Sequence, residues 1–317
     1  MFILSSLSVS EDLLFELTKK FPNATFSFSE SMDEAKIELH KAEILITYGE
    51  DLTEELIEEA TKLKWIMVMS AGMERMPFEA IKKKRILVTN ARGIHKIPMA
   101  EYTLAMMLQY SRKTNILNEQ QTERIWDRTT VHTFELFNKS VAILGVGAIG
   151  GEIARLCKAF NMRVIGVNST GNEVSFVDQM YTLKELNDVV HQADFIVSVL
   201  PSTNETKYLL KKHHFEQMKN GVVLINIGRG DLVEEQILVD ALFDGHVAHA
   251  VLDVFEEEPL PEEHQFWRME NVTVTPHVSS YTKNYLPRCF VIFQQNLMAY
   301  IKGGEELINK IDLDRGY

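Results

Sequence analysis

The sequence predicts an α/β protein of two domains, one built on a doubly wound parallel sheet and the other a smaller α/β domain. Short apolar segments with the composition of strands alternate with amphipathic or charged segments of helical period. At 317 residues, the chain is longer than one ordinary core requires. The alternation restarts at a glycine-rich turn near residue 145, which separates two series of strands and helices.

Four strands are expected in the first series, at residues 2–5, 44–47, 65–69 and 86–89. Each is a short run of mostly apolar residues, and charged helical segments such as residues 53–60 lie between them. This series predicts the smaller domain.

Six strands are expected in the second series, at residues 141–145, 163–167, 195–200, 222–227, 249–254 and 272–275. A long helical stretch over residues 99–112 precedes them, and another over residues 283–301 follows. We therefore expect the chain to return to its first domain, so that residues 1–98 and 283–317 form one domain and residues 99–282 the other. The two long helices would then bridge the cleft between the domains.

The strand at residues 141–145 leads into three spaced glycines and an amphipathic helix. Gly145 permits a tight turn, Gly147 lets the backbone approach a pyrophosphate, and Gly150 allows the helix to pack closely on the strand. Free N–H groups and the positive end of the helix dipole favour a phosphate there. Because an apolar strand precedes the glycines and another follows the helix, the pattern predicts a dinucleotide-binding turn.

Charge and cysteine content exclude several classes of function. Acidic residues outnumber basic residues 45 to 33, and the formal net charge of -12 disfavours binding to nucleic acid or to an anionic membrane. The sequence opens without a basic leader, and no apolar run reaches membrane-spanning length, so we expect a cytoplasmic protein. Cys157 and Cys289 alone indicate no disulfide framework, and no histidine pair has ligand spacing beside carboxylates, so no metal site is predicted.

Four further segments follow the glycine turn in order, at residues 199–206, 225–233, 251–260 and 274–280. They contain Pro201, Arg229, Glu258 and His277 in turn. With these motifs in this order and spacing, the chain resembles the D-isomer-specific 2-hydroxyacid dehydrogenases over nearly its whole length. The resemblance implies a Rossmann-type NAD(P)-binding domain and a flavodoxin-like substrate domain.

The resemblance implies that Arg229, Glu258 and His277 are the catalytic residues. Reduction of a 2-oxo acid needs a hydride at the carbonyl carbon and a proton at its oxygen, and an imidazole suits the proton transfer. Glu258 would bind the other ring nitrogen and favour the protonated ring, and Arg229 would hold the substrate carboxylate and polarise the carbonyl. Taken singly, each residue also has an ordinary structural interpretation. Arg229 fits a cap at a strand end, Glu258 fits an acidic surface run, and His277 fits a loop histidine with satisfied hydrogen bonds.

By the same resemblance, the loop after the strand at residues 65–69 binds the substrate carboxylate. Backbone N–H groups of Ala71, Gly72 and Met73 would form the anion site, and domain closure would bring them to Arg229 and exclude water. A loop of small residues after a strand is also a common connection without a binding role.

The resemblance also assigns residues to the cofactor. The pyrophosphate would lie on the glycine turn, and Asp253 would accept a hydrogen bond from the nicotinamide carboxamide. Met99 fits a nicotinamide contact and plain core packing equally well. The full expected set is Met99, Gly145, Gly147, Ala148, Ile149, Gly150, Asn168, Ser169, Thr170, Leu200, Pro201, Thr206, Ile227, Gly228 and Asp253.

The end of the second strand of this domain bears on the choice of cofactor. NAD enzymes of this type carry an acidic residue there, which accepts from the ribose hydroxyls. Asn168, Ser169 and Thr170 stand at this position instead. Loss of the repelling charge favours NADP over NAD, but no arginine follows immediately and Asn168 also suits NAD.

The sequence thus predicts an oxidoreductase that reduces a small 2-oxo acid, such as glyoxylate or hydroxypyruvate, to the D-2-hydroxy acid with NAD(P)H. We expect a homodimer formed through the long helix after Met99, and no nucleic-acid or membrane partner. Two alternatives remain at this stage: a dinucleotide-sensing binding protein of the corepressor type with little turnover, and a structural pair of domains that binds no dinucleotide.

Overall fold

The computed structural model describes residues 1–70, 72–73, 75–304 and 306–313. The chain divides into two compact units: unit 1 contains Met1–Ile94 and Lys283–Tyr317, and unit 2 contains His95–Thr282. Unit 2 begins one residue before the helix α5 (Lys96–Arg112), whereas the sequence-based division after residue 98 falls inside that helix. Backbone hydrogen bonds join the turns of a helix into one element, so α5 belongs whole to unit 2.

Unit 1 is built on a five-stranded sheet in which all neighbouring strands are parallel. The strand order is β2-β1-β3-β4-β5, the order of flavodoxin-like folds. Both faces of the central strands are covered, so every residue of β3 and β4 is buried. The strands are β1 (Phe2–Ser5), β2 (Thr25–Phe28), β3 (Ile44–Thr47), β4 (Trp65–Val68) and β5 (Leu87–Asn90).

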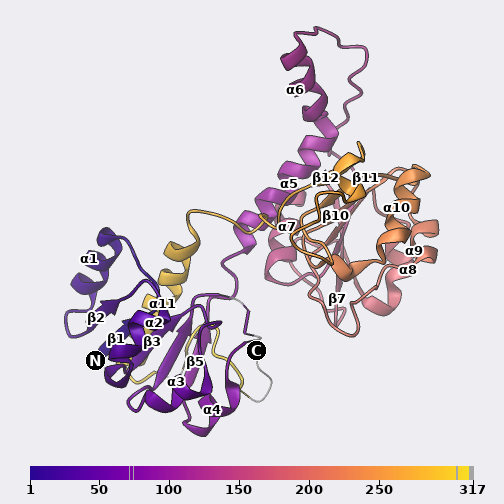
Figure 1. Ribbon diagram of the computed structural model, residues 1–317. Helices are drawn as coiled ribbons and strands as arrows, with labels where there is room; N and C mark the ends of the chain where they lie inside the picture. The colour runs from indigo at the N-terminus through magenta and orange to yellow at the C-terminus, as the bar shows by residue number, and fades with distance from the viewer. Residues whose placement is uncertain (71, 74, 305, 314–317) are drawn as a thin grey trace. The chain divides into compact units, whose positions relative to one another are not determined.

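Helices cover both faces of this sheet (Figure 1). One face packs against α1 (Glu11–Lys20) and α11 (Tyr285–Ile301). The other packs against α2 (Met32–Ala35), the 3₁₀ helix η1 (Lys36–Lys41), α3 (Glu54–Glu59) and α4 (Phe78–Lys83). The ring of Trp65 on β4 stacks on Phe293 of α11 with 5.6 Å between centroids, so the two separate parts of the chain share one core.

Unit 2 is built on a seven-stranded sheet, again with all neighbours parallel. The strand order is β12-β11-β10-β9-β6-β7-β8. The order reverses between β6 and β9, and ligands of such sheets bind outside the carboxyl ends of the strands at this switch point. The strands are β6 (Ser140–Leu144), β7 (Arg163–Asn168), β8 (Gln179–Thr182), β9 (Phe195–Ser198), β10 (Val222–Asn226), β11 (Val247–Leu252) and β12 (Val272–Val274).

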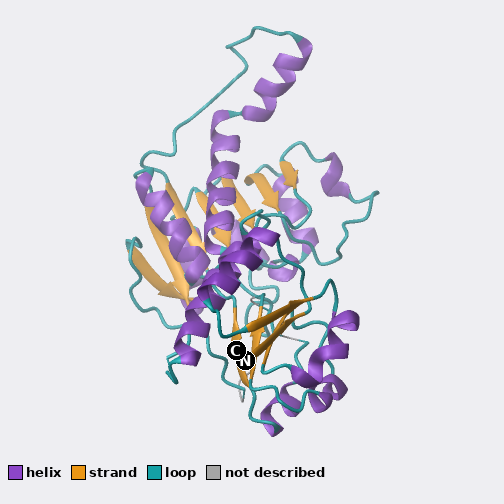
Figure 2. Cartoon of the chain, turned by 90° about the vertical axis from the view of Figure 1, so that its left-hand side faces the viewer, coloured by secondary structure: helices purple, strands orange, loops and turns teal. Residues whose placement is uncertain are grey.

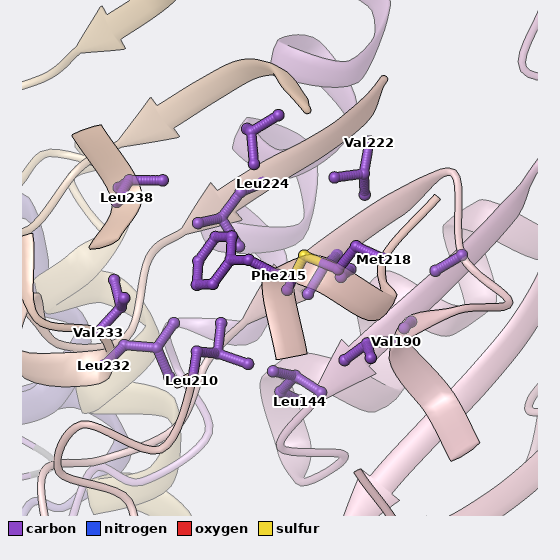
Figure 3. Close-up of a cluster of buried hydrophobic side chains, with 14 of the residues drawn as sticks. Leu144, Val190, Leu210, Phe215, Met218, Val222, Leu224, Leu232, Val233 and Leu238 are labelled. Atoms are coloured by element: carbon purple, nitrogen blue, oxygen red, sulfur yellow. The ribbon is translucent and has the colours of Figure 1, made fainter. Parts of the chain in front are cut away.

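Two apolar layers sandwich the sheet of unit 2, because successive residues of a strand face opposite sides. Ile143 of β6 packs in the layer of α5 and α7 (Ala148–Ala159). Leu144, the next residue, packs in the layer of α8 (Leu186–Val190), α9 (Lys212–Gln217) and α10 (Glu235–Phe243). Figure 3 shows Phe215 of α9 in this second layer beside Leu210 and Leu224. Short 3₁₀ helices are η2 (Leu183–Glu185), η3 (Gly230–Leu232) and η4 (Gln265–Arg268).

The predicted fold class is confirmed: both sheets are parallel and helices lie on both faces of each. All ten predicted strands are present within two residues at either end. Two further strands, β2 and β8, were not predicted, and each lies at the edge of its sheet.

A helical arm extends from unit 2. After α5, Lys113 takes a positive φ of 56° and ends the helix, and α6 (Thr114–Glu123) follows. Figures 1 and 2 both show α6 beyond the end of α5 that is remote from the sheet of unit 2. No residue of α6 is buried. Neither these helices nor any other in the described ranges is long and apolar enough to cross a membrane.

Candidate active site

The glycine turn joins β6 to α7 at the switch point of the unit 2 sheet. Gly145 has a φ of +104°, which favours glycine, and a Cβ on Gly150 would lie 2.3 Å from the carbonyl oxygen of Gly145. A Cβ on Gly147 would meet no atom within 4 Å, so the space beside this residue is open. Ala148 and Ile149 begin α7, whose first N–H groups lack helical partners. The turn therefore fits a pyrophosphate.

The segment after β7 forms a compact turn around Asn168. Its Oδ1 accepts hydrogen bonds from the backbone N–H groups of Thr170 (3.0 Å) and Gly171 (2.6 Å). The amide group of Asn168 donates to the carbonyl of Asn172 at 3.3 Å. The side chain of Asn168 thus shapes the loop, and the exposed side chains at its tip are those of Ser169 and Thr170.

The segments after β9 and β10 lie against each other at the carboxyl edge of the sheet. A Cβ on Gly228 would lie 2.6 Å from the carbonyl oxygen of Leu200, so only glycine allows this approach. Pro201 is exposed, whereas Thr206 is buried and its hydroxyl donates to the Pro201 carbonyl at 2.5 Å, closing the loop. Ile227 is buried beneath this edge.

His277 and Glu258 form a hydrogen-bonded pair after β12 and β11. Nδ1 of His277 lies 2.8 Å from Oε2 of Glu258, and Oε1 of Glu258 accepts from the backbone N–H of Phe255 at 2.9 Å. Within the described residues, Nε2 of His277 has no hydrogen-bond partner, and the side chain is 47% exposed. The arrangement orients the ring by one nitrogen and leaves the other available to a bound molecule.

The charges around Glu258 keep it ionised. Burial acts to raise the pKa of this carboxyl, but the hydrogen bonds from His277 and Phe255 and the charges of His277 and Arg229 outweigh it and hold the pKa below its ordinary value. Glu258 therefore presents an ionised carboxylate to the imidazole of His277.

Arg229 lies on the loop after β10, next to the loop of Glu258. Its guanidinium donates to the carbonyl of Gly228 at 2.7 Å, and its own carbonyl accepts from the side chain of Asn226 at 2.8 Å. A Cβ on Gly230 would lie 1.9 Å from the backbone carbon of Phe255. Gly230 thus brings the loops of Arg229 and Glu258 together, a role that was not predicted and that only the structure reveals.

Asp253 and Met99 are buried beside this edge. Asp253 is 0% exposed, and its carboxylate accepts from Thr275 and from the amides of Val278 and Ser279, all in the segment that contains His277. Met99 lies in α5 with its side chain in the apolar layer beneath β6. The sequence assigned Asp253 to the cofactor but gave no signal of its contacts to this segment.

The three loop residues predicted for the substrate lie in unit 1, after β4. Gly72 is exposed, and its carbonyl accepts from the hydroxyl of Ser70 at 3.0 Å. Met73 is buried, with its side chain in the apolar core. Ala71 lies outside the described residues.

Comparison with known proteins is consistent with this geometry. Residues 104–279, more than half of the chain, match the model of the "D-isomer specific 2-hydroxyacid dehydrogenase, NAD binding domain". The chain is 31% identical to glyoxylate reductase of Aeropyrum pernix over 78% of this chain and 76% of that protein. It is 30% identical to D-3-phosphoglycerate dehydrogenase of Methanocaldococcus jannaschii over 84% of this chain, but spans only 51% of that longer relative.

Solved structures agree with the fold of the whole chain. A D-isomer specific 2-hydroxyacid dehydrogenase family protein of Aeromonas salmonicida superposes with a TM-score of 0.83 and 35% identity, covering 99% of this chain and 98% of that one. A D-isomer specific 2-hydroxyacid dehydrogenase of Xanthobacter autotrophicus in complex with NADPH and MES gives a TM-score of 0.78 and 25% identity, with 100% and 98% covered. The chain therefore belongs to the D-isomer specific 2-hydroxyacid dehydrogenase family.

Proposed function

We propose that this protein reduces a small 2-oxo acid, of the glyoxylate or hydroxypyruvate type, to the D-2-hydroxy acid with NAD(P)H. The observation that carries the proposal is the pair of His277 and Glu258, 2.8 Å apart, in the same unit as a glycine turn that fits a pyrophosphate. A dinucleotide-binding domain that holds a polarised imidazole suits proton-coupled hydride transfer.

The chain's own residues account for the proton and for substrate orientation. A bound reduced nicotinamide supplies the hydride. His277 donates a proton from Nε2 to the carbonyl oxygen, while Glu258 holds Nδ1 and stabilises the charged ring. Arg229 binds the substrate carboxylate through its planar donors.

Unit 2 supplies the residues for the cofactor. The pyrophosphate would lie in the open space beside Gly147 and at the first turn of α7. The adenosine side would lie along Leu200, Pro201 and Thr206, and the nicotinamide would lie against Ile227 and Gly228. Met99 and Asp253 complete the set at the nicotinamide end.

We propose that NADPH is preferred over NADH. Oδ1 of Asn168 already accepts from the backbone N–H groups of Thr170 and Gly171 and from the hydroxyl of Thr170, so it is a poor acceptor for ribose hydroxyls, whereas the exposed hydroxyl of Ser169 can donate. Neutral donors suit a 2′-phosphate better than the acidic residue of NAD enzymes does. The measurement is kcat/KM for both reduced cofactors with one substrate, and a strong preference for NADH would refute this assignment.

We also propose that two copies associate through α5 and α6. The arm carries exposed apolar side chains in and after α6, which are Ile116, Leu117, Ile125 and Trp126. Such a patch favours a protein partner, and a second copy offers the same patch in return.

Steady-state assays test the main proposal. Glyoxylate, hydroxypyruvate and pyruvate are each offered with NADPH and with NADH, and we expect turnover of at least one of these acids. In His277→Gln we expect kcat to fall by about a hundredfold or more, with the affinity for the cofactor unchanged. Cofactor binding without turnover of any 2-oxo acid would instead favour a dinucleotide-sensing protein. Failure to bind either cofactor would leave only the structural alternative.

A further inference from the structure

The carboxylate of Asp253, directly after β11, is surrounded by donors from a single segment. Thr275 Oγ1 lies 2.5 Å and the amide of Val278 2.9 Å from Oδ1, and the amide of Ser279 lies 2.9 Å from Oδ2. A carboxylate with no exposed surface is unfavourable without such partners. The three donors lie on both sides of His277 in the sequence, so Asp253 fixes the backbone before and after that residue.

The backbone at His277 needs this support. Its φ of 53° lies in the left-handed region, which a residue with a Cβ adopts at a cost. Its own N–H donates to the carbonyl of Thr275 at 3.0 Å, which closes a tight turn. The direction in which the imidazole leaves the chain is therefore set by contacts that hold this turn.

Tyr102 of α5 extends the network. Its hydroxyl lies 2.7 Å from Thr275 Oγ1. Burial, together with the charge of Asp253, raises the pKa of Tyr102 to about 12 despite the hydrogen bond to Thr275, so the phenol keeps its proton. Asp253, which already accepts from two amides, also accepts from the hydroxyl of Thr275. The single proton of Thr275 thus goes to Asp253, and Tyr102 must donate to Thr275.

We propose that Tyr102 and Thr275 are positioning residues for His277, acting in series through the Asp253 carboxylate to hold the left-handed turn that presents the imidazole. This inference rests on the proposed role of His277 in proton transfer. It gives α5 a part in the reaction beyond packing, since a side chain of that helix supports the turn that bears the proton donor.

Three variants test whether Tyr102 acts through Thr275: Thr275→Val, Thr275→Ser and Tyr102→Phe. Thr275→Val keeps the shape and removes the hydroxyl, and we expect kcat to fall by about tenfold. Thr275→Ser should recover most of this loss. Tyr102→Phe should cost about threefold, and the double variant Tyr102→Phe/Thr275→Val should be no slower than Thr275→Val alone, because Tyr102 acts through Thr275.

Thr273→Val is the matched control. Thr273 lies two residues earlier in β12, and its hydroxyl lies 2.8 Å from Nε2 of His249 rather than beside Asp253. The same substitution there should leave kcat unchanged. A kcat for Thr275→Val equal to that of the wild type, or multiplicative effects of the two substitutions, would overturn the proposal.

An NMR measurement separates failure of this proposal from failure of the proposed function. In ¹⁵N-histidine spectra of the whole protein, with His277 signals assigned by their loss in His277→Gln, we expect Thr275→Val to move the His277 signals. Thr273→Val should move those of His249 instead. If the wild type reduces no 2-oxo acid but Thr275→Val still moves the His277 signals, the enzymatic function is refuted and the positioning role stands. If the His277 signals do not move, the positioning role is refuted whatever the activity.

Discussion

Glu258 can be tested by a change that removes its charge but keeps its size. We expect Glu258→Gln to lower kcat/KM for 2-oxo acid reduction by about tenfold or more, because the imidazole loses the carboxylate that orients it through Nδ1. The pKa of Glu258 lies below its ordinary value of 4.5, so the side chain is ionised at any pH above 4.5. Its contribution to stability is lost only as the pH falls through the lower pKa of the folded state. Its titration therefore adds no limb to an assay above about pH 5. Rates measured across the pH range check this.

The adjacent residue supplies the control for that experiment. Glu257→Gln makes the same change at an exposed side chain that has no described hydrogen bond to the imidazole. Its kcat/KM should match that of the wild type. A wild-type kcat/KM in Glu258→Gln would show that the carboxylate does not act on His277.

Arg229 is expected to act through the planarity of its guanidinium. Arg229→Lys keeps the charge but loses the paired donors, so kcat/KM for the 2-oxo acid should fall by about a hundredfold while cofactor Kd stays constant. Arg268→Lys is the control, because Arg268 makes an exposed ion pair with Glu263 at 3.0 Å. Equal effects of the two variants would remove Arg229 from the substrate site.

At the scale of single residues, the sequence could identify the residues expected to carry the chemistry, but not the contacts that hold them in place. His277 and Glu258 were identified from motifs 19 positions apart, and the structure brings them to hydrogen-bond distance. The links from Asp253 to Thr275 and on to Tyr102 were not predicted. They join the ends of β11 and β12 to α5 and depend on side-chain rotamers, which no spacing along the chain encodes.

At the scale of elements, the glycine turn offers a matched pair of substitutions in one helix. Gly150→Ala would place Cβ 2.3 Å from the Gly145 carbonyl oxygen, so α7 must shift, and we expect a loss of about 1–3 kcal/mol in stability and at least about tenfold weaker cofactor binding. In Gly151→Ala the new Cβ meets no atom within 4 Å, and helix propensity should raise stability by up to about 1 kcal/mol. Thermal unfolding and cofactor titration of both variants check the pair, and equal behaviour would contradict the packing role of Gly150.

The elements that the sequence missed share a physical reason. β2 and β8 are four residues each and lie at sheet edges, and none of their residues is buried. A strand with one neighbour and partial cover needs no continuous apolar run, so its sequence lacks the signal that marked the central strands. Strands such as β4 and β10, buried at every residue, were predictable because their composition is dictated by two apolar layers.

At the scale of the whole molecule, the chain must fold unit 1 from two segments that are distant in the sequence. The core beneath β1 and β4 includes Phe290 and Phe293 of α11, which is synthesised after all of unit 2. Unit 1 therefore cannot complete its core until the C-terminal helix has been made. This order follows from topology alone and was implied by the long helix after residue 283.

Association of two chains is the prediction that concerns the molecule as a whole. The exposed apolar residues of the α6 arm, with Trp126 94% exposed, must overcome the mutual repulsion of chains with a net charge of -12. We expect light scattering to give twice the 36.4 kDa chain mass, and Leu117→Ser/Trp126→Ser to shift the protein toward the monomer. Phe243→Ser is the control, since Phe243 on α10 is 88% exposed but lies outside the arm. A wild type of single-chain mass, or dissociation by the control as well, would show that the arm is not the interface.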